Sequence, residues 1–156
     1  MKRENKLENA QRATRNAQRA TQGNFERDAK FDLEERLLDY AARIIRFSDS
    51  LPAPRAGNHV AGQLLRAGTS PLPNHGEAQA AESIDDFIHK IRICHKELRE
   101  TRRWLRLCHR VPLVKNPRAI EPLIDETVEL IRIFASSVKT TIARQGSRRG
   151  KSAPAP

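Results

Sequence analysis

The spacing of apolar residues constrains the fold of this chain more than any other feature. In three long stretches, mostly apolar residues recur in alternating steps of four and three, which places them on one side of an α-helix. These seams consist of Leu33, Leu37, Tyr40, Ile44, Phe47 and Leu51; of Phe87, Ile91, Cys94, Leu98, Thr101, Leu105 and Cys108; and of Ile124, Val128, Ile131, Ala135, Val138 and Ile142. Prolines lie between these stretches or at their ends, where they stop or start helices. The pattern therefore predicts several helices that share a bundle core.

The first two of four predicted helices lie in the N-terminal half of this bundle. The first begins near Asp32, where an acidic side chain can cap it. The second spans about residues 58–81, and Pro71 and Pro73 within it predict a kink or a break. We expect the helix to resume near His75.

The third and fourth predicted helices have clear start signals. The third is predicted to begin at Ser83, whose hydroxyl can cap a helix, and to end at Pro112. Asn116 followed by Pro117 is typical of a helix start, and Pro122 can delay the fourth helix by one turn.

The fourth helix has more apolar surface than a narrow seam requires. Beside its seam lies a second row of mostly apolar residues, which consists of Ile120, Leu123, Thr127, Leu130 and Phe134. Two adjacent rows predict a second interface, and hence oligomerisation. A single broad core face is the alternative explanation.

The composition agrees with an all-α fold. Aromatic residues make up only 4% of the chain and there are 7 glycines, which is poor material for a β-sandwich or a β-barrel. We therefore predict one domain, an antiparallel up-down four-helix bundle over residues 31–143. Residues 1–30 are expected to form a basic polar arm that is disordered or marginally helical, and residues 144–156 a disordered basic tail.

The net charge of +10 is concentrated at the two ends of the chain. Residues 1–30 carry 8 Lys/Arg against 4 Asp/Glu, and residues 144–156 carry 4 against none, whereas residues 31–143 carry 17 against 15. Basic tails attract nucleic acids and acidic surfaces without sequence specificity. Solubility is an equally good explanation for tails of this length.

The sharpest polar pattern is a basic row on the third predicted helix. Its members step by fours and threes and consist of Arg92, Lys96, Arg99, Arg103, Arg106 and Arg110, with Arg102 and His109 beside them. Such a row can bind phosphates, because arginine is suited to bidentate phosphate contacts. It can instead pair with acidic residues at the start of the fourth helix, which are Glu121, Asp125, Glu126 and Glu129. No aromatic residue is interleaved for base stacking, which argues against specific recognition of a single strand.

The sequence offers little for catalysis or for a bound metal ion. No two of the five histidines have the spacing of a metal site on one helix, and there is no Cys-x-x-Cys motif. Cys94 and Cys108 lie 14 residues apart on an apolar seam, so we expect them to be buried and unbridged. We expect no enzymatic activity, no cofactor and no small-molecule substrate.

The chain also lacks the features of a membrane or secreted protein. No apolar run reaches the roughly 20 residues that span a bilayer. Two cysteines do not make a disulfide framework. We therefore expect a cytoplasmic protein without a membrane partner.

The second predicted helix contains a family motif. The stretch Gln63-Leu-Leu-Arg-Ala-Gly-Thr-Ser70, followed by Asn74 and Glu77, resembles the signature of the bacterial four helix bundle protein family. Founding members of that family are encoded in intervening sequences inside large-subunit ribosomal RNA genes. The resemblance continues through residues 86–93 and 96–107 and covers nearly the whole predicted bundle.

One stretch of the chain departs from the family pattern. Pro71-Leu72-Pro73 stands just before the asparagine of the motif, where family members have at most one proline. The polar residues of the motif lie on a helix that is expected to be buried, and buried polar groups need partners. We expect them to bond between helices, either inside one bundle or across a subunit interface; they are Gln63, Arg66, Thr69, Ser70, Asn74 and Glu77.

The resemblance implies a bundle that assembles as a ring-like homopentamer and has no enzymatic activity. A related branch, the accessory variability proteins of diversity-generating retroelements, forms basic pentamers that bind a reverse transcriptase and nucleic acid. The stretch Trp104-Leu-Arg-Leu107 is similar to that branch. The expected function is therefore non-catalytic assembly with binding of RNA, or of a nucleic-acid enzyme, through basic surfaces. A purely structural bundle and an accessory subunit of a reverse transcriptase are the alternatives.

Overall fold

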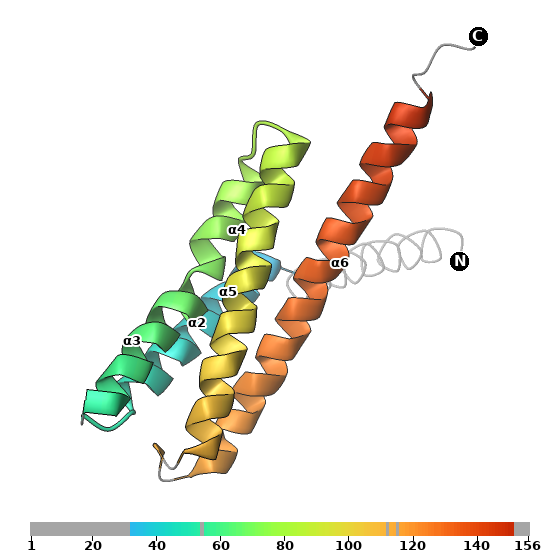
Figure 1. Ribbon diagram of the computed structural model, residues 1–156. Helices are drawn as coiled ribbons and strands as arrows, with labels where there is room; N and C mark the ends of the chain where they lie inside the picture. Colours follow the sequence, from blue (N-terminus) through green and yellow to red (C-terminus); the bar gives the residue numbers. More distant parts are fainter. Residues whose placement is uncertain (1–31, 54, 112, 115, 152–156) are drawn as a thin grey trace, which may run out of the picture. The chain divides into compact units, whose positions relative to one another are not determined.

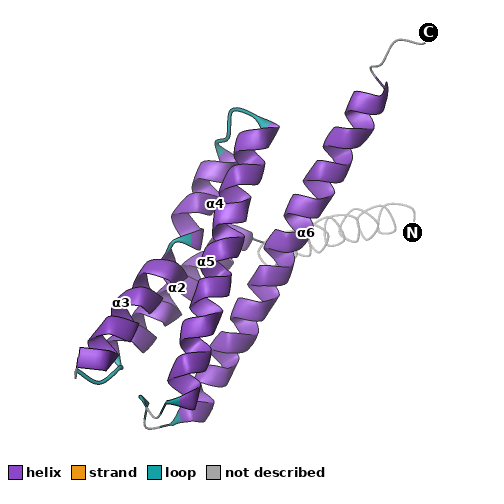
Figure 2. Ribbon diagram, in the orientation of Figure 1, coloured by secondary structure: helices purple, strands orange, loops and turns teal. Residues whose placement is uncertain are grey.

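The protein is all-helical in the part that the structure describes. The computed structural model describes residues 32–53, 55–111, 113–114 and 116–151, with side chains as far as residue 147. Its elements are α2 (Leu33–Asp49), α3 (Arg55–Thr69), α4 (Pro71–Gln79), α5 (Ile84–Arg110), the short 3-10 helix η1 (Pro117–Ile120) and α6 (Glu121–Lys151) (Figures 1 and 2). This arrangement confirms the predicted all-α fold of helices packed against each other. The predictions for the N-terminal arm lie outside the described residues.

The second predicted helix is in fact two helices. α3 ends at Thr69 and α4 begins at Pro71, so the break predicted from the proline pair is present. The restart comes at Pro71 itself and not near His75, because a proline lacks the N–H that the first turn leaves unbonded and its fixed φ suits a helix. Ser70 between them keeps helical backbone angles (φ −56°, ψ −34°), so the interruption is short.

The starts of α5 and α6 follow the predicted capping signals. The Ser83 hydroxyl accepts a hydrogen bond from the Asp86 amide at 3.1 Å. The Asn116 side chain accepts one from the Arg118 amide at 3.2 Å, and η1 follows directly. α6 then begins at Glu121, one turn after the Asn-Pro signal, as the second proline predicted.

α6 extends farther than the sequence suggests. The charge and composition predict a bundle that ends at residue 143 and a disordered tail after it, yet α6 runs to Lys151. The arginine and glutamine residues there are good helix formers, and Gly146 and Gly150 each cost only about 1 kcal/mol in a helix. No proline lies between residues 144 and 151, so every residue there keeps its backbone N–H and the helix continues.

The core of the bundle is built around α5. The residues from Glu34 onward form one compact unit, in which α5 packs against α3, α4 and α6. Figure 1 shows α5 between the α3–α4 pair and α6. The predicted seam of α5 is half-buried at Phe87 and fully buried after it, with at most 2% exposure for Ile91, Cys94, Leu98, Thr101, Leu105 and Cys108. On α2, the predicted seam residues Leu37, Tyr40 and Ile44 are at most 1% exposed.

The two apolar rows of α6 have the opposite roles from those that the sequence suggests. The row predicted to be secondary is the core face, with at most 4% exposure for Ile120, Leu123, Thr127, Leu130 and Phe134. The row predicted to be the main seam is half-buried or exposed, and Ile142 in it is 43% exposed. The inward row is the one that meets α2 and α5, and its burial removes the apolar side chains of Leu130 and Phe134 from water.

Close polar contacts hold α2 against α6. The Tyr40 hydroxyl lies 2.7 Å from the Thr127 hydroxyl in the buried interior. At the edge of the same contact, Arg36 makes a two-pronged ion pair with Glu126, at 2.6 and 3.0 Å. The pairing with Glu126 holds the pKa of Arg36 above its usual range. α2 is thus fixed to α6 by one buried and one half-buried polar contact.

Candidate nucleic-acid interface

The basic row lies along the outside of α5. Its side chains, and those of Arg102 and His109, are all exposed. They are displaced around the helix from the buried seam, because the two sets of residues follow the same four-and-three steps in different registers. The row therefore forms a continuous cationic strip that spans about 27 Å at 1.5 Å per residue.

The acidic residues of α6 form no ion pair with an arginine or lysine of this strip in the described part of the chain. Glu126 pairs with Arg36 of α2, and Glu129 pairs with Arg132 of its own helix. Among the residues that the structure describes, no arginine or lysine of the basic row forms an ion pair. For Glu126 the reason is the rotation of α6: with Thr127 facing the core, Glu126 is directed toward Arg36 of α2.

A hollow lies beside the basic row where α5 ends and α6 begins. Its volume is about 600 Å³, and it is lined by Arg103, Arg106, Leu107, His109, Arg110, Glu121, Ile124 and Asp125. We call this site the α5–α6 hollow. Nε2 of His109 lies 3.8 Å from Oε1 of Glu121, and no arginine of the hollow forms an ion pair within the described part of the chain. The sequence predicted that arginines of the row can pair with the acids at the start of the fourth helix; the structure brings Glu121 and Asp125 beside the row without such arginine–carboxylate ion pairs among the described residues.

The row also affects one histidine beside it. Partial burial and the nearby positive charge of Arg99 lower the pKa of His95 below its usual range. His95 is therefore neutral at pH 7 and adds no charge to the strip. The cationic character of the row comes from its arginines and Lys96.

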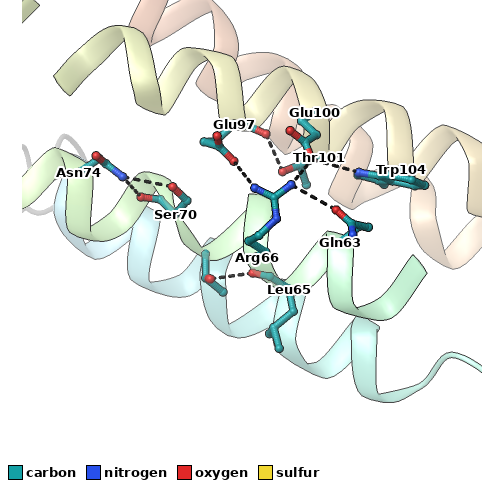
Figure 3. Close-up of polar contacts among 10 residues, drawn as sticks. Gln63, Leu65, Arg66, Ser70, Asn74, Glu97, Glu100, Thr101 and Trp104 are labelled. Atoms are coloured by element: carbon teal, nitrogen blue, oxygen red, sulfur yellow. Dashed lines mark hydrogen bonds and ion pairs between the residues drawn. The ribbon is translucent and has the colours of Figure 1, made fainter. Parts of the chain in front are cut away.

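The polar motif of α3 and α4 meets α5 through side chains that are not part of the basic row. Arg66 of α3 contacts Glu97 and Glu100 of α5, and it also bonds with Gln63 one turn earlier (Figure 3). The indole N–H of Trp104 donates to Glu100 at 3.4 Å (Figure 3). The sequence singled out Gln63 and Arg66 but missed their partners on α5, since nothing in the linear pattern set those acids apart.

The rest of the motif bonds locally or reaches α5 by a second ion pair. Glu77 of α4 pairs with Lys90 of α5. Thr69 donates to a carbonyl of its own helix, and the Asn74 amide donates to the Ser70 carbonyl and hydroxyl at 2.9 and 3.1 Å (Figure 3). The motif thus links α3 and α4 to α5 at two points inside one bundle.

The two cysteines are fully buried thiols. Cys94 and Cys108 are both free and 0% exposed. The Cys94 thiol donates to the Pro71 carbonyl at 3.4 Å, across the start of α4. Burial raises the pKa of Cys94 to about 12 and that of Cys108 to about 11, so neither is a thiolate near neutral pH. Both side chains are packing residues of the α5 seam.

Neither a metal site nor a membrane-spanning helix is found in the part of the chain that the structure describes. Among these residues, no three histidine, cysteine or acidic side chains are grouped so that they could hold a metal ion. None of the described helices is both long and apolar enough to cross a bilayer.

Comparison with known proteins identifies relatives of the chain. The family model described as 23S rRNA-intervening sequence protein matches residues 29–136. A solved structure of a protein of unknown function, from the S23 ribosomal protein family of Bacteroides thetaiotaomicron, has 31% sequence identity and a TM-score of 0.63. The match covers 68% of this chain and 97% of that chain. Among curated proteins, none matches significantly.

Proposed function

The chain belongs to the 23S rRNA-intervening sequence protein family, and from its exposed basic row we propose that it is a non-catalytic, self-assembling bundle that binds RNA phosphates along α5. The row is exposed, and its arginines and Lys96 have no ion-pair partners among the described residues. This observation supports RNA binding most directly. Cations that pair with carboxylates lose affinity for phosphates, whereas these remain available. Counterion release on binding favours a polyanion over a single small anion.

Salt-dependent RNA binding tests this proposal. We expect the full-length protein to bind a single-stranded RNA with an affinity that falls steeply as the salt concentration rises. Reversing two charges, as Arg99→Glu with Arg103→Glu, should weaken binding more than about tenfold. The same change should lower the salt slope by about one unit for each phosphate that is no longer bound.

A matched variant controls for net charge. Arg46→Glu with Lys139→Glu also reverses two exposed cations, but on α2 and α6, outside the basic row. It should reduce the affinity much less. Equal losses of affinity in the two variants would mean that net charge and not the row drives binding. If the wild-type protein binds no RNA at low salt, the alternative of a purely structural bundle is favoured.

Self-assembly is the second part of the proposal. The outer row of α6 and the 49% exposed Leu38 and 43% exposed Ile45 of α2 leave more apolar surface in contact with water than a monomer of this size needs. The family resemblance implies a homopentamer. Light scattering should therefore give a mass near five times the 17.7 kDa of one chain. A 17.7 kDa particle at micromolar concentration would rule out assembly.

The absence of catalysis is also part of the proposal. The buried thiols are not nucleophiles near neutral pH, as their raised pKa values require. The polar groups between α3 and α5 are engaged with each other, and none is arranged as a nucleophile beside a base. Incubation of the protein with RNA should leave the RNA intact, and cleavage or modification that depends on the protein would contradict this part.

A further inference from the structure

The α5–α6 hollow has three kinds of lining, and together they match one kind of ligand. Three guanidinium groups line it, from Arg103, Arg106 and Arg110. Two carboxylates, from Glu121 and Asp125, lie in the same hollow. Apolar surface comes from Leu107, which is 40% exposed, and from Ile124. From this combination we propose that the hollow binds a single guanine base of the RNA, an inference that rests on the proposed RNA binding.

The polar lining complements the edges of guanine. Guanine presents two acceptors, N7 and O6, on one edge, and an arginine can donate to both at once. Its Watson–Crick edge presents two adjacent donors, N1–H and the N2 amine, and a carboxylate can accept from both. A site with both guanidinium and carboxylate groups can satisfy these two edges together, and the hollow has both kinds of residue on facing helices.

The other bases fit this lining less well. Adenine and cytosine each place one donor beside an unprotonated ring nitrogen, so a carboxylate gains one hydrogen bond and faces one lone pair. Uracil flanks its single donor with two carbonyl oxygens, which a carboxylate repels. The carboxylates thus disfavour adenine, cytosine and uracil, and they favour guanine.

The apolar lining and the volume suit a single base. A base taken out of a stack needs flat surface on its faces, which guanidinium planes and aliphatic side chains provide where aromatic rings are lacking. A volume of about 600 Å³ is large enough for one base with its sugar. The lack of aromatic residues along the basic row argues against recognition of successive bases by stacking. Recognition of one base at the end of the row does not need such aromatic residues.

The α5–α6 hollow also joins directly to the basic row. Arg103, Arg106 and Arg110 belong to both. A strand bound by its phosphates along α5 would therefore bring one nucleotide to the end of the helix, beside Glu121 and Asp125. The row would supply most of the affinity and the hollow the base preference.

Binding of short RNAs to the full-length protein tests the inference. The probes are a seven-nucleotide oligouridine, the same strand with one central guanosine, and the same strand with inosine, which lacks the N2 amine. By fluorescence anisotropy, wild-type protein should bind the guanosine strand about tenfold more tightly than oligouridine, with inosine in between. Glu121→Gln with Asp125→Asn should remove this preference and leave binding of oligouridine as tight as before or tighter.

A second pair of substitutions controls for the change in charge. Glu82→Gln with Glu129→Gln removes two exposed carboxylates outside the hollow and should keep the guanosine preference. If wild-type protein binds guanosine and uridine strands equally, the inference fails while RNA binding stands. If the preference persists without Glu121 and Asp125, the base is read elsewhere and the inference also fails. If neither strand binds, the proposed RNA binding itself is wrong and the inference falls with it.

Discussion

At the scale of single residues, Gly68 shows how closely α2 and α3 approach. A Cβ atom built on Gly68 would lie 2.7 Å from Cγ2 and 2.9 Å from Cγ1 of Ile44. Ile44 is fully buried and branched at Cβ, so its side chain cannot turn away. Gly62, on the same helix, has no neighbouring atom within 4 Å of such a Cβ. The first glycine is therefore required by packing and the second is not.

Alanine substitution at these two glycines should have opposite effects. Gly68→Ala should lower the free energy of unfolding by about 1–3 kcal/mol, because overpacking outweighs the gain in helix propensity. Gly62→Ala should raise it by about 0.5–1 kcal/mol, since the exposed site gains propensity without a clash. Urea denaturation measures both. A stabilised Gly68→Ala variant would show that α2 and α3 are less closely packed than the structure describes.

The buried thiols predict a loss of stability at alkaline pH. A folded-state pKa above the unfolded value of about 8.5 means that the folded protein holds its thiol protons more tightly. Stability from these groups is thus complete below about pH 8.5 and is lost as the pH rises toward 11 and 12. The free energy of unfolding should fall between about pH 8.5 and pH 10, and burial of Tyr40, which raises the pKa of its hydroxyl, adds to the loss as the pH approaches 10.

Removing the thiols gives the control for this pH dependence. The double variant Cys94→Ala, Cys108→Ala is expected to be less stable at every pH, because it leaves small cavities. Its unfolding free energy should nevertheless change less between about pH 8.5 and pH 10 than that of the wild type. An identical slope in the two proteins would assign the alkaline effect to other groups.

At the scale of elements, α6 shows what apolar spacing can and cannot predict. The four-and-three pattern correctly indicated that α6 has two apolar rows, and it placed the start of the helix within a few residues. It could not rank the rows, because both have the same period and similar hydrophobicity. The choice depends on which partner helices face each side, and a linear pattern does not contain that information. On α5, with only one apolar row, the same method identified the buried side correctly.

The outer row of α6 should tolerate charge in the monomer but not in an assembly. Val128→Glu with Ala135→Glu places two charges on this row, whose positions are half-buried and exposed. We expect the variant to keep its helical circular dichroism and to shift to a lower mass in light scattering, since burying an unpaired charge costs several kcal/mol. Ser136→Glu, on an exposed position next to this row, is the control and should leave the mass unchanged. An unchanged mass in the double variant would place the interface elsewhere.

The candidate site was only partly predictable at this scale. Every member of the basic row could be identified from the sequence, because helical periodicity alone determines which residues share a side. The sequence left open whether the acids of α6 neutralise the row, because that depends on the rotation of a second helix. Glu126 pairs with Arg36 of α2, a residue that lies 90 positions earlier in the chain. Contacts of this kind, and the α5–α6 hollow, arise from tertiary packing.

At the scale of the whole molecule, α5 makes the bundle a single cooperative unit. It contacts α3, α4 and α6, so separation of any of these helices from α5 would expose part of the buried seam of α5 to water. Trp104 is the only tryptophan of the chain, and it lies on α5 opposite α3, with its ring 5.9 Å from that of His59. Its fluorescence therefore reports on the α3–α5 contact, whereas circular dichroism reports on all helices together.

Thermal unfolding should follow one transition and depend on protein concentration. Trp104 fluorescence and far-ultraviolet circular dichroism should give the same Tm, as expected for a two-state unit. If folding is coupled to assembly, Tm should rise by about 3 °C for each tenfold increase in concentration. Two separate transitions would mean that part of the bundle unfolds on its own, and a constant Tm would argue for a stable monomer.

The displacement of the basic row from the buried seam of α5 has an evolutionary consequence. The seam residues are fixed by packing, so most substitutions there cost stability. The row residues contact water and have no ion-pair partners among the described residues, so they can change with little effect on folding. Selection can therefore act on the two sides of one helix independently. Related proteins are free to diverge in ligand preference while they keep the same bundle, and differences among them should accumulate on the outer side of α5.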